Sequence, residues 1–197
     1  MEKNLFLETY FIDEDICDRL IKMFHDHPRM DPNAKPMYFA KGKHVEADPN
    51  IKQSTDLSVT MDDSLKYPVV VDYLEALQDC IDSYTEKWPT CNWYAPWKIT
   101  SPINLQYYKP TEAYHGWHTE RCSTNDISIS RHLVFMTYLN TVTDQGGTEF
   151  YNQKLTINAE KGKTVIWPAD WTFTHRGVPS PTQEKYIITG WFNYIDD

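Results

Sequence analysis

The residues best suited to bind a metal or catalyse a reaction lie in the segment Tyr114–Arg121, which holds two histidines and one glutamate. Side chains two positions apart in extended backbone point to the same side, whereas side chains three positions apart do not. His118 and Glu120 can therefore approach one metal ion together, while His115 would point away from it. An isolated H-x-E pair is more often a surface salt bridge, so this pair needs support from the rest of the chain.

A third ligand must come from a distant part of the chain. His175 is the best candidate, because it lies just before the last strongly patterned strand. Two histidines and one carboxylate on one face of an octahedral ion leave three positions open, which suits Fe(II) and oxygen chemistry. Asp126 is a rival carboxylate near the first pair, but the polar residues around it predict a loop.

The elements that must position these residues change character at about Trp97, from helix periodicity to strand periodicity. A chain of 197 residues comfortably buries one core, so we expect a single domain. Residues 1–96 are expected to form a helical support and a substrate loop, and residues 97–197 a barrel or jelly-roll core. The predicted fold class is therefore mainly β with flanking helices (α+β).

Two helices are predicted over residues 13–26 and 72–88, where apolar side chains recur at helical spacing, with Asp13 as the cap of the first. Residues 28–65 lack such periodicity and predict a long loop with one short strand at Ser54–Val59. A loop of that length in a compact domain usually has a function. Segments rich in β-branched and aromatic residues predict further strands at Lys98–Tyr108, Arg131–Asn140, Thr148–Tyr151, Thr164–Trp167 and Lys185–Tyr194.

The charge and composition of the chain limit the kinds of partner that it can bind. The net charge of −9 argues against nucleic acid or an anionic membrane surface, because both would repel the chain at long range. We expect a peptide or small-molecule substrate instead, and the oligomeric state is left open. The scattered cysteines form no C-x-x-C pair, which favours reduced thiols. No apolar run approaches the roughly 20 residues that cross a bilayer, and the first residues do not resemble a secretory signal, so a cytoplasmic protein is expected.

A series of motifs between residues 106 and 194 resembles the catalytic core of the 2-oxoglutarate/Fe(II)-dependent dioxygenases, and most closely the prolyl-4-hydroxylase-like group. The matching positions are Tyr108, the pair His118 and Glu120, Arg131, Tyr138-Leu139-Asn140, Gly146-Gly147-Thr148-Glu149-Phe150, Lys161-Gly162, His175 and Lys185 with the strand that follows it. Their order and spacing agree with the family. Glu120 replaces the usual aspartate, and its extra methylene would reach the same ion with a different bend.

The resemblance implies a double-stranded β-helix, or jelly roll, that holds Fe(II) through His118, Glu120 and His175. It also implies 2-oxoglutarate and O2 as cosubstrates, with ascorbate as a candidate reductant. The distal carboxylate of 2-oxoglutarate is assigned to Lys185, because a buried carboxylate must be paired. The hydroxyls expected to assist Lys185 are those of Tyr108, Tyr138 and Thr189.

The inward face of the last strand follows from alternation. An inward Lys185 brings Ile187, Thr189 and Trp191 to the same side. Trp191 and Trp167 are therefore candidates for an apolar wall of the pocket, with an ordinary core position as the alternative. Among the remaining histidines, His132 is a further candidate for a residue that contacts the metal ligands. The others are expected at the surface or in loops.

The family resemblance favours hydroxylation of an unactivated C–H bond, with a prolyl residue of a peptide or protein as the first choice of substrate. The segment Lys52-Gln53-Ser54 resembles the R-x-S segment of prolyl-4-hydroxylases, and it could form a mobile lid. Lys52 and Ser54, together with Trp191, Arg121 and Arg176, are the substrate-pocket candidates. The alternative for Lys52 and Asp56 is that they are ordinary solvated loop charges. The alternative for Arg121 and Arg176 is that they face away from the metal.

Two other functions remain open. The first is hydroxylation of a free amino acid or another small molecule. The second is a cupin-like binding module that has lost catalysis. Such a module would be expected to lose a metal ligand or the anchoring base first, and this sequence keeps both.

Overall fold

A computed structural model describes residues 6–27, 37–40, 43–46, 48–122 and 127–196 of the chain. Its helical elements are α1 (Glu14–Asp26), α2 (Met61–Ser64), α3 (Pro68–Lys87), η1 (Pro89–Asn92), η2 (Ile127–Ser130) and η3 (Trp171–Phe173). Its strands are β1 (Glu8–Phe11), β2 (Met37–Ala40), β3 (Lys43–Glu46), β4 (Thr55–Val59), β5 (Trp97–Ile99), β6 (Ile103–Tyr108), β7 (Arg131–Tyr138), β8 (Thr148–Phe150), β9 (Leu155–Ile157), β10 (Lys163–Pro168), β11 (His175–Gly177) and β12 (Lys185–Tyr194).

Two antiparallel sheets form the body of the fold. The larger sheet has the order β1-β10-β7-β12-β6-β4, and β5 pairs with the far end of β12. The smaller sheet has the order β11-β8-β9, and β2 pairs with β3 as a separate hairpin. Together with the structural comparisons given below, this topology identifies the double-stranded β-helix that was expected.

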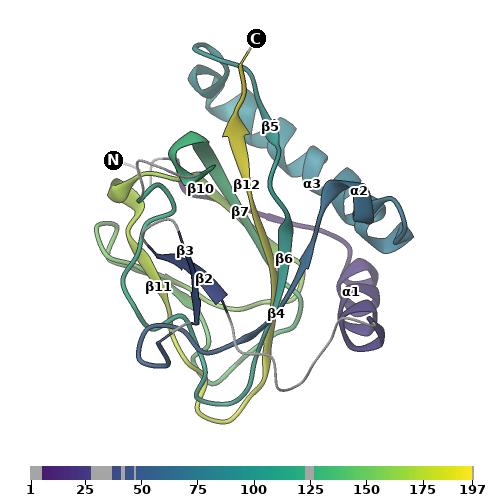
Figure 1. The fold of residues 1–197 in the computed structure, drawn as a ribbon, viewed down its shortest axis with the longest axis vertical. Coiled ribbons are helices and arrows are strands. Elements are labelled where there is room, and N and C mark those ends of the chain that lie inside the picture. Colours follow the sequence, from purple (N-terminus) through teal and green to yellow (C-terminus); the bar gives the residue numbers. More distant parts are fainter. Residues whose placement is uncertain (1–5, 28–36, 41–42, 47, 123–126, 197) are drawn as a thin grey trace.

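The large sheet is buried on both faces, which explains why its central strand is nearly all apolar. Along β7, Leu133 and Phe135 face the helices, whereas Val134, Met136 and Tyr138 face the interior of the barrel. Figure 1 shows α1 and α3 along one side of this sheet, with β11 on the opposite side. The metal-ligand candidates therefore have to reach the interior between the two sheets.

The two long helices form where the sequence predicted them. Asp13 caps α1, because its side chain accepts a hydrogen bond from the backbone nitrogen of Asp15 at 2.9 Å. The second helix begins at Pro68, four residues before the predicted start at 72, and proline is favoured at the first helical position because it lacks an N–H that would need a partner. Among the described residues, no helix combines the length and the apolar character needed to cross a membrane.

The N-terminal half contributes more strand than expected. β1 and β4 both belong to the large sheet, so the barrel does not begin at residue 97. β4 confirms the short strand predicted at 54–59, whereas β1, β9 and β11 were not predicted. The predicted strand over 98–108 is divided into β5 and β6, and these pair with different parts of β12. Within the predicted loop 28–65, the hairpin β2–β3 and the short helix α2 also form, while residues 28–36, 41–42 and 47 lie outside the described part.

Candidate metal and cosubstrate site

The two candidate histidines are held against each other by their own backbone. His118 N donates to His175 O at 3.0 Å, and His175 N donates to His118 O at 2.9 Å, although residues 114–121 form no named strand. Each ring then hydrogen-bonds through Nδ1 to a carbonyl two residues earlier, Gly116 O or Phe173 O, at 2.9 Å in both cases. These bonds place the proton of each neutral ring on Nδ1, so each Nε2 keeps a lone pair for a ligand.

Glu120 completes the constellation that the spacing predicted. Its Oε1 lies 3.4 Å from His175 Nε2 and 3.7 Å from His118 Nε2. One ligand atom from each of the three residues lies within 4.8 Å of the others. Two imidazole nitrogens and one carboxylate oxygen at such distances fit the donor set of a non-haem Fe(II) site.

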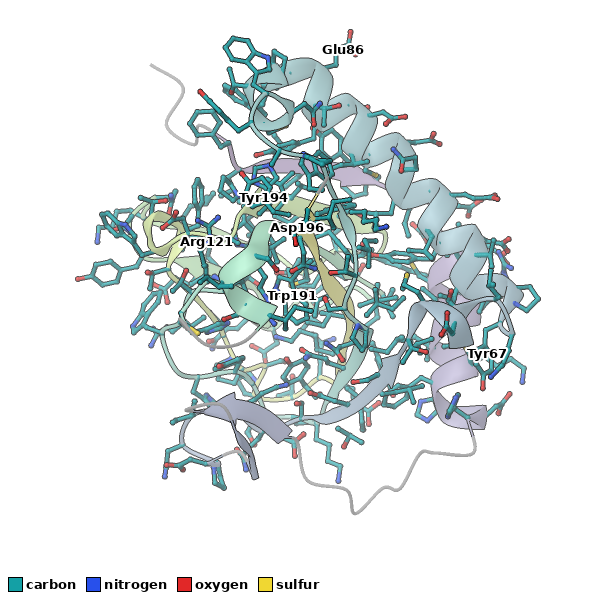
Figure 2. All side chains as sticks on the ribbon, turned by 45° about the horizontal axis from the view of Figure 1, so that its top comes forward. Tyr67, Glu86, Arg121, Trp191, Tyr194 and Asp196 are labelled. Carbon is teal, nitrogen blue, oxygen red and sulfur yellow. The ribbon has the colours of Figure 1, made fainter. Side chains whose placement is uncertain are left out.

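The other carboxylate oxygen of Glu120 is fully engaged by the protein. Oε2 accepts hydrogen bonds from Trp191 Nε1 at 2.9 Å and from Arg131 Nη1 at 3.1 Å. The guanidinium of Arg131 lies over the indole of Trp191, with its carbon 3.7 Å from the ring centroid. In Figure 2, Trp191 lies near the centre of the barrel strands, while Arg121 lies further out. The family motif contains Arg131, but its spacing from Glu120 gave no sign that the two residues touch.

The protonation states suit metal binding. Burial, together with the neighbouring His175, lowers the pKa of His118 to about 3. Burial alone would raise the pKa of Glu120, but the neighbouring His175 and the charge of Arg131 lower it well below its ordinary value. At neutral pH the site therefore offers an uncharged His118 ring and an ionised carboxylate, which are the forms that bind metals.

Aromatic rings fix the orientation of both histidines. Tyr114 stacks on His118 with centroids 3.7 Å apart and an interplanar angle of 9°. Trp167 meets His175 edge to face, with centroids 5.1 Å apart, and Phe150 lies 5.5 Å from the same ring. Trp167 thus lines the metal-ligand cluster as well as the core, so both alternatives for this tryptophan hold. Sequence spacing gave no signal for Tyr114, because its contact depends on how residues 114–118 bend.

Lys185 lies inside the barrel without a carboxylate. The side chain points inward as alternation predicted, and the residue is only 4% exposed. Its Nζ donates to Gly146 O at 3.0 Å and lies 4.8 Å from the ring centroid of Tyr108. No acidic group of the described residues forms an ion pair with it, and burial lowers its pKa to about 8. Such a buried cation without an anionic partner is costly and indicates a place for an anion.

The three hydroxyls expected beside Lys185 already have protein partners. Tyr108 donates to Gln106 Oε1 at 2.6 Å, and Tyr138 donates to Thr148 Oγ1 at 2.6 Å. Thr189 donates to Phe135 O at 2.9 Å. Hydroxyls bonded in this way offer only lone pairs to a ligand, and a lone pair repels a carboxylate. In this arrangement Lys185 is the group best placed to donate to an anion, and each hydroxyl would have to rotate to help.

The segment around Lys52 is packed against the body of the protein, so its charges are not solvated loop charges. Lys52 and Ser54 are each 5% exposed, and Lys52 forms an ion pair with Asp56 while Ser54 donates to the same carboxylate at 2.7 Å. The backbone also pairs with residues 113–116, for example through Gln53 N to Ala113 O at 2.9 Å. The mobile lid is therefore not supported. Lys52 Nζ lies 5.8 Å from the centroid of the Tyr114 ring that stacks on His118, which places the segment next to the metal-ligand cluster.

The two arginines proposed for the substrate pocket are held by acidic partners. Arg176 pairs with Glu149 at 2.8 Å across β11 and β8 and lies over the ring of Trp117. Arg121 donates to Arg131 O at 2.9 Å, and its Nη1 lies 3.6 Å from Asp170 Oδ2. These contacts favour the outward-facing alternative for both residues.

His132 and His27 have partners away from the metal-ligand cluster. His132 hydrogen-bonds to Cys91 O at 3.0 Å and contacts the rings of Trp97 and Tyr194, so it is not a neighbour of the metal-ligand cluster. His27 is buried rather than exposed, and its Nε2 lies 2.8 Å from the hydroxyl of Tyr67. Asp126 lies outside the described residues.

Comparison with known proteins supports the same family. Residues 103–193 match the family model of the 2OG-Fe(II) oxygenase superfamily, which confirms the resemblance seen in the sequence for this segment. The comparison with curated protein sequences gives no match. Solved structures similar to this chain include the viral collagen prolyl hydroxylase vCPH of Paramecium Bursaria Chlorella virus-1 in its 2OG complex, with 17% identity, 96% of this chain and 97% of that chain covered, and a TM-score of 0.70.

Two further structures share the fold. A prolyl-4-hydroxylase of Pseudomonas putida is 15% identical, with coverage of 97% of this chain and 94% of that chain and a TM-score of 0.65. A prolyl hydroxylase of Trichoplax adhaerens, solved with a peptide fragment of the hypoxia inducible factor oxygen degradation domain, is 14% identical, with coverage of 96% and 84% and a TM-score of 0.70. Identities this low establish the shared fold and leave the substrate to be determined.

Proposed function

We propose that this chain, whose residues 103–193 match the 2OG-Fe(II) oxygenase superfamily, hydroxylates a prolyl residue of a peptide or protein with Fe(II) and 2-oxoglutarate. In this proposal His118, Glu120 and His175 hold the iron, and Lys185 holds the distal carboxylate of 2-oxoglutarate. Ascorbate remains a candidate reductant.

The observation that carries the proposal is the presence of two complementary features in one barrel. One is the cluster of His118, Glu120 and His175, whose ligand atoms lie within 4.8 Å of one another. The other is the buried Lys185, which has no anion among the described residues. A metal that binds a 2-oxo acid at one end and a cation that binds the carboxylate at the other end match the two ends of 2-oxoglutarate.

The protein's part in such a reaction is to bind, orient and exclude water. Iron in such a site supplies the activation of O2 needed to oxidise an unactivated carbon. The backbone pair between His118 and His175 sets the directions of both Nε2 atoms. Trp167, Phe150 and the stacked Tyr114 surround the rings with apolar surface, which limits water around a reactive centre.

The choice of a prolyl substrate rests on two supports. The similar solved structures are described as prolyl hydroxylases, one of them with a bound peptide fragment. In addition, Lys52 and Ser54 resemble the R-x-S segment of that group; both are buried, Lys52 Nζ lies 5.8 Å from the centroid of the Tyr114 ring, and Ser54 donates to Asp56. A packed segment of this kind could form part of a fixed wall for a substrate chain.

The test is an assay with Fe(II), 2-oxoglutarate and ascorbate across proline-containing peptides, free L-proline, other free amino acids and nucleosides. Succinate formation and a gain of one oxygen by mass spectrometry are measured together, and His175→Ala is the matched inactive control. Oxygen gained on peptides and not on free L-proline supports the proposal. Turnover of a free small molecule with every peptide inert would reject the peptide substrate and keep the oxygenase. Binding of 2-oxoglutarate with no succinate from any compound would instead favour a binding module.

A further inference from the structure

The two carboxylate oxygens of Glu120 have different partners. Oε1 faces the Nε2 atoms of both histidines, whereas Oε2 is turned away from them toward Trp191 and Arg131. A glutamate side chain has one more rotatable bond than an aspartate, so its carboxylate can take more orientations and can offer both oxygens to one ion. A glutamate in this position therefore depends more than an aspartate on neighbours that fix which oxygen faces the metal.

Arg131 and Trp191 provide a constraint of the required geometry, and we call these two residues the carboxylate clamp. Arg131 Nη1 donates both to Glu120 Oε2 at 3.1 Å and to Glu120 O at 2.9 Å, so one nitrogen connects the side chain and the backbone of the same residue. Trp191 Nε1 donates to Oε2 at 2.9 Å, and its ring carries the guanidinium at 3.7 Å. Each member of the clamp thus holds Oε2 and also holds the other member.

The clamp is maintained at a cost to the fold. Arg131 Nε is buried and has no hydrogen-bond partner in the described structure. A buried donor without a partner destabilises the fold. The side chain could avoid this cost by turning toward solvent, but it would then lose Oε2 and the stacking on Trp191. The arrangement thus keeps the guanidinium on the carboxylate and on the indole at the same time.

We propose that Arg131 and Trp191 are positioning residues that hold Oε2 of Glu120 off the metal, so that the glutamate binds through Oε1 alone. This inference rests on the proposed metal site and explains how the chain uses a glutamate where related sequences usually have aspartate. Neighbours that orient a metal ligand typically change metal affinity by about 10–100-fold when they are removed. The clamp should therefore be visible in metal binding itself, without turnover.

The test is a double-mutant cycle between Trp191→Phe and Glu120→Asp, with Co(II) alone as the probe. Trp191→Phe keeps an aromatic ring for the guanidinium and removes the N–H donor, together with the five-membered part of the indole. In the parent background it should weaken Co(II) binding by about 10-fold or more, measured by competition with a chromophoric chelator. Aspartate is one methylene shorter and should not reach from the metal to Trp191 Nε1. In the Glu120→Asp background, Trp191→Phe should therefore change Co(II) affinity by less than about threefold, and the two substitutions should be non-additive.

Arg131→Lys is a second route to the same result, because a lysine cannot both stack on the indole and donate with a planar fork. It too should weaken Co(II) binding in the glutamate background more than in the aspartate background. Thermal unfolding of the metal-free variants separates this effect from a general loss of structure. Equal losses in both backgrounds, or no loss in the parent background, would overturn the clamp while the metal site stands. Parent protein that binds Co(II) no better than His175→Ala would overturn the metal site and the clamp with it.

Discussion

Removal of the charge on Lys185 should weaken 2-oxoglutarate binding by at least about 100-fold. Burial lowers the pKa of this lysine from its ordinary 10.5 to about 8, with no anion among the described residues to offset it. At about 1.36 kcal/mol per pKa unit, the fall corresponds to a penalty of about 3 kcal/mol for the protonated side chain. A bound carboxylate would recover that energy. Breaking a buried ion pair costs about 3–5 kcal/mol, which agrees and corresponds to two or more powers of ten in affinity.

The assay compares the parent with Lys185→Met, which keeps most of the side-chain volume. Both proteins are loaded with Mn(II) and titrated calorimetrically with 2-oxoglutarate and with 2-oxopentanoate, in which a methyl group replaces the distal carboxylate. The substitution should weaken binding of 2-oxoglutarate only, and Mn(II) affinity should be unchanged. An equal loss for both ligands would show that Lys185 shapes the pocket without pairing, and equal 2-oxoglutarate affinity in both proteins would refute the assignment.

The remaining predictions concern pH, the metal and the core. Because burial lowers the pKa of Lys185 in the folded state, the protonated side chain destabilises the fold below about pH 8, and this effect is relieved as the pH rises toward 10.5. Urea unfolding of the parent should therefore show a free energy of unfolding that rises over that interval, and Lys185→Met should lack this contribution. The same pH dependence of stability in both proteins would contradict the prediction. Anaerobic Fe(II) with 2-oxoglutarate should give the weak visible band of a chelated 2-oxo acid, and His118→Ala or His175→Ala should abolish it; an undiminished band would remove that residue from the ligand set. Gly190→Ala should destabilise the fold by about 1–3 kcal/mol, because the new Cβ would lie 2.4 Å from Cζ of the fully buried Phe135, and an unchanged urea midpoint would contradict this.

The sequence predicted the parts of the fold that depend on local periodicity. Asp13 and the apolar spacing after it located α1, because a cap and an amphipathic face are properties of a few neighbouring residues. Alternation along β12 correctly placed Lys185, Ile187 and Trp191 in the interior for the same reason. β1 and β9 were missed because three or four residues are too few to show a period, and their pairing partners lie far away in the chain.

In the candidate site, too, contacts between residues close in sequence could be predicted, whereas contacts between distant strands could not. The spacing of His118 and Glu120 predicted that they would meet, and the structure brings them together with His175. The contacts of Glu120 with Arg131 and Trp191 could not be predicted, because they arise only when β7 and β12 pair and bring these side chains to one point. Lys52 was open to interpretation as a loop charge because its burial depends on an ion pair and on pairing with residue 114, neither of which has a local sequence signal.

The reciprocal backbone bonds between His118 and His175 bear on how such a site selects its metal. Both imidazoles are oriented by main-chain hydrogen bonds and by Nδ1 bonds to carbonyls, so protein groups set the directions of their Nε2 atoms. A face of two nitrogens and one oxygen follows the general order of divalent affinities, in which Co(II), Ni(II) and Cu(II) exceed Fe(II). For a metal site of this kind, occupancy by iron is set by metal supply in the surroundings, and the protein isolated from a heterologous host would carry the metals that host provides.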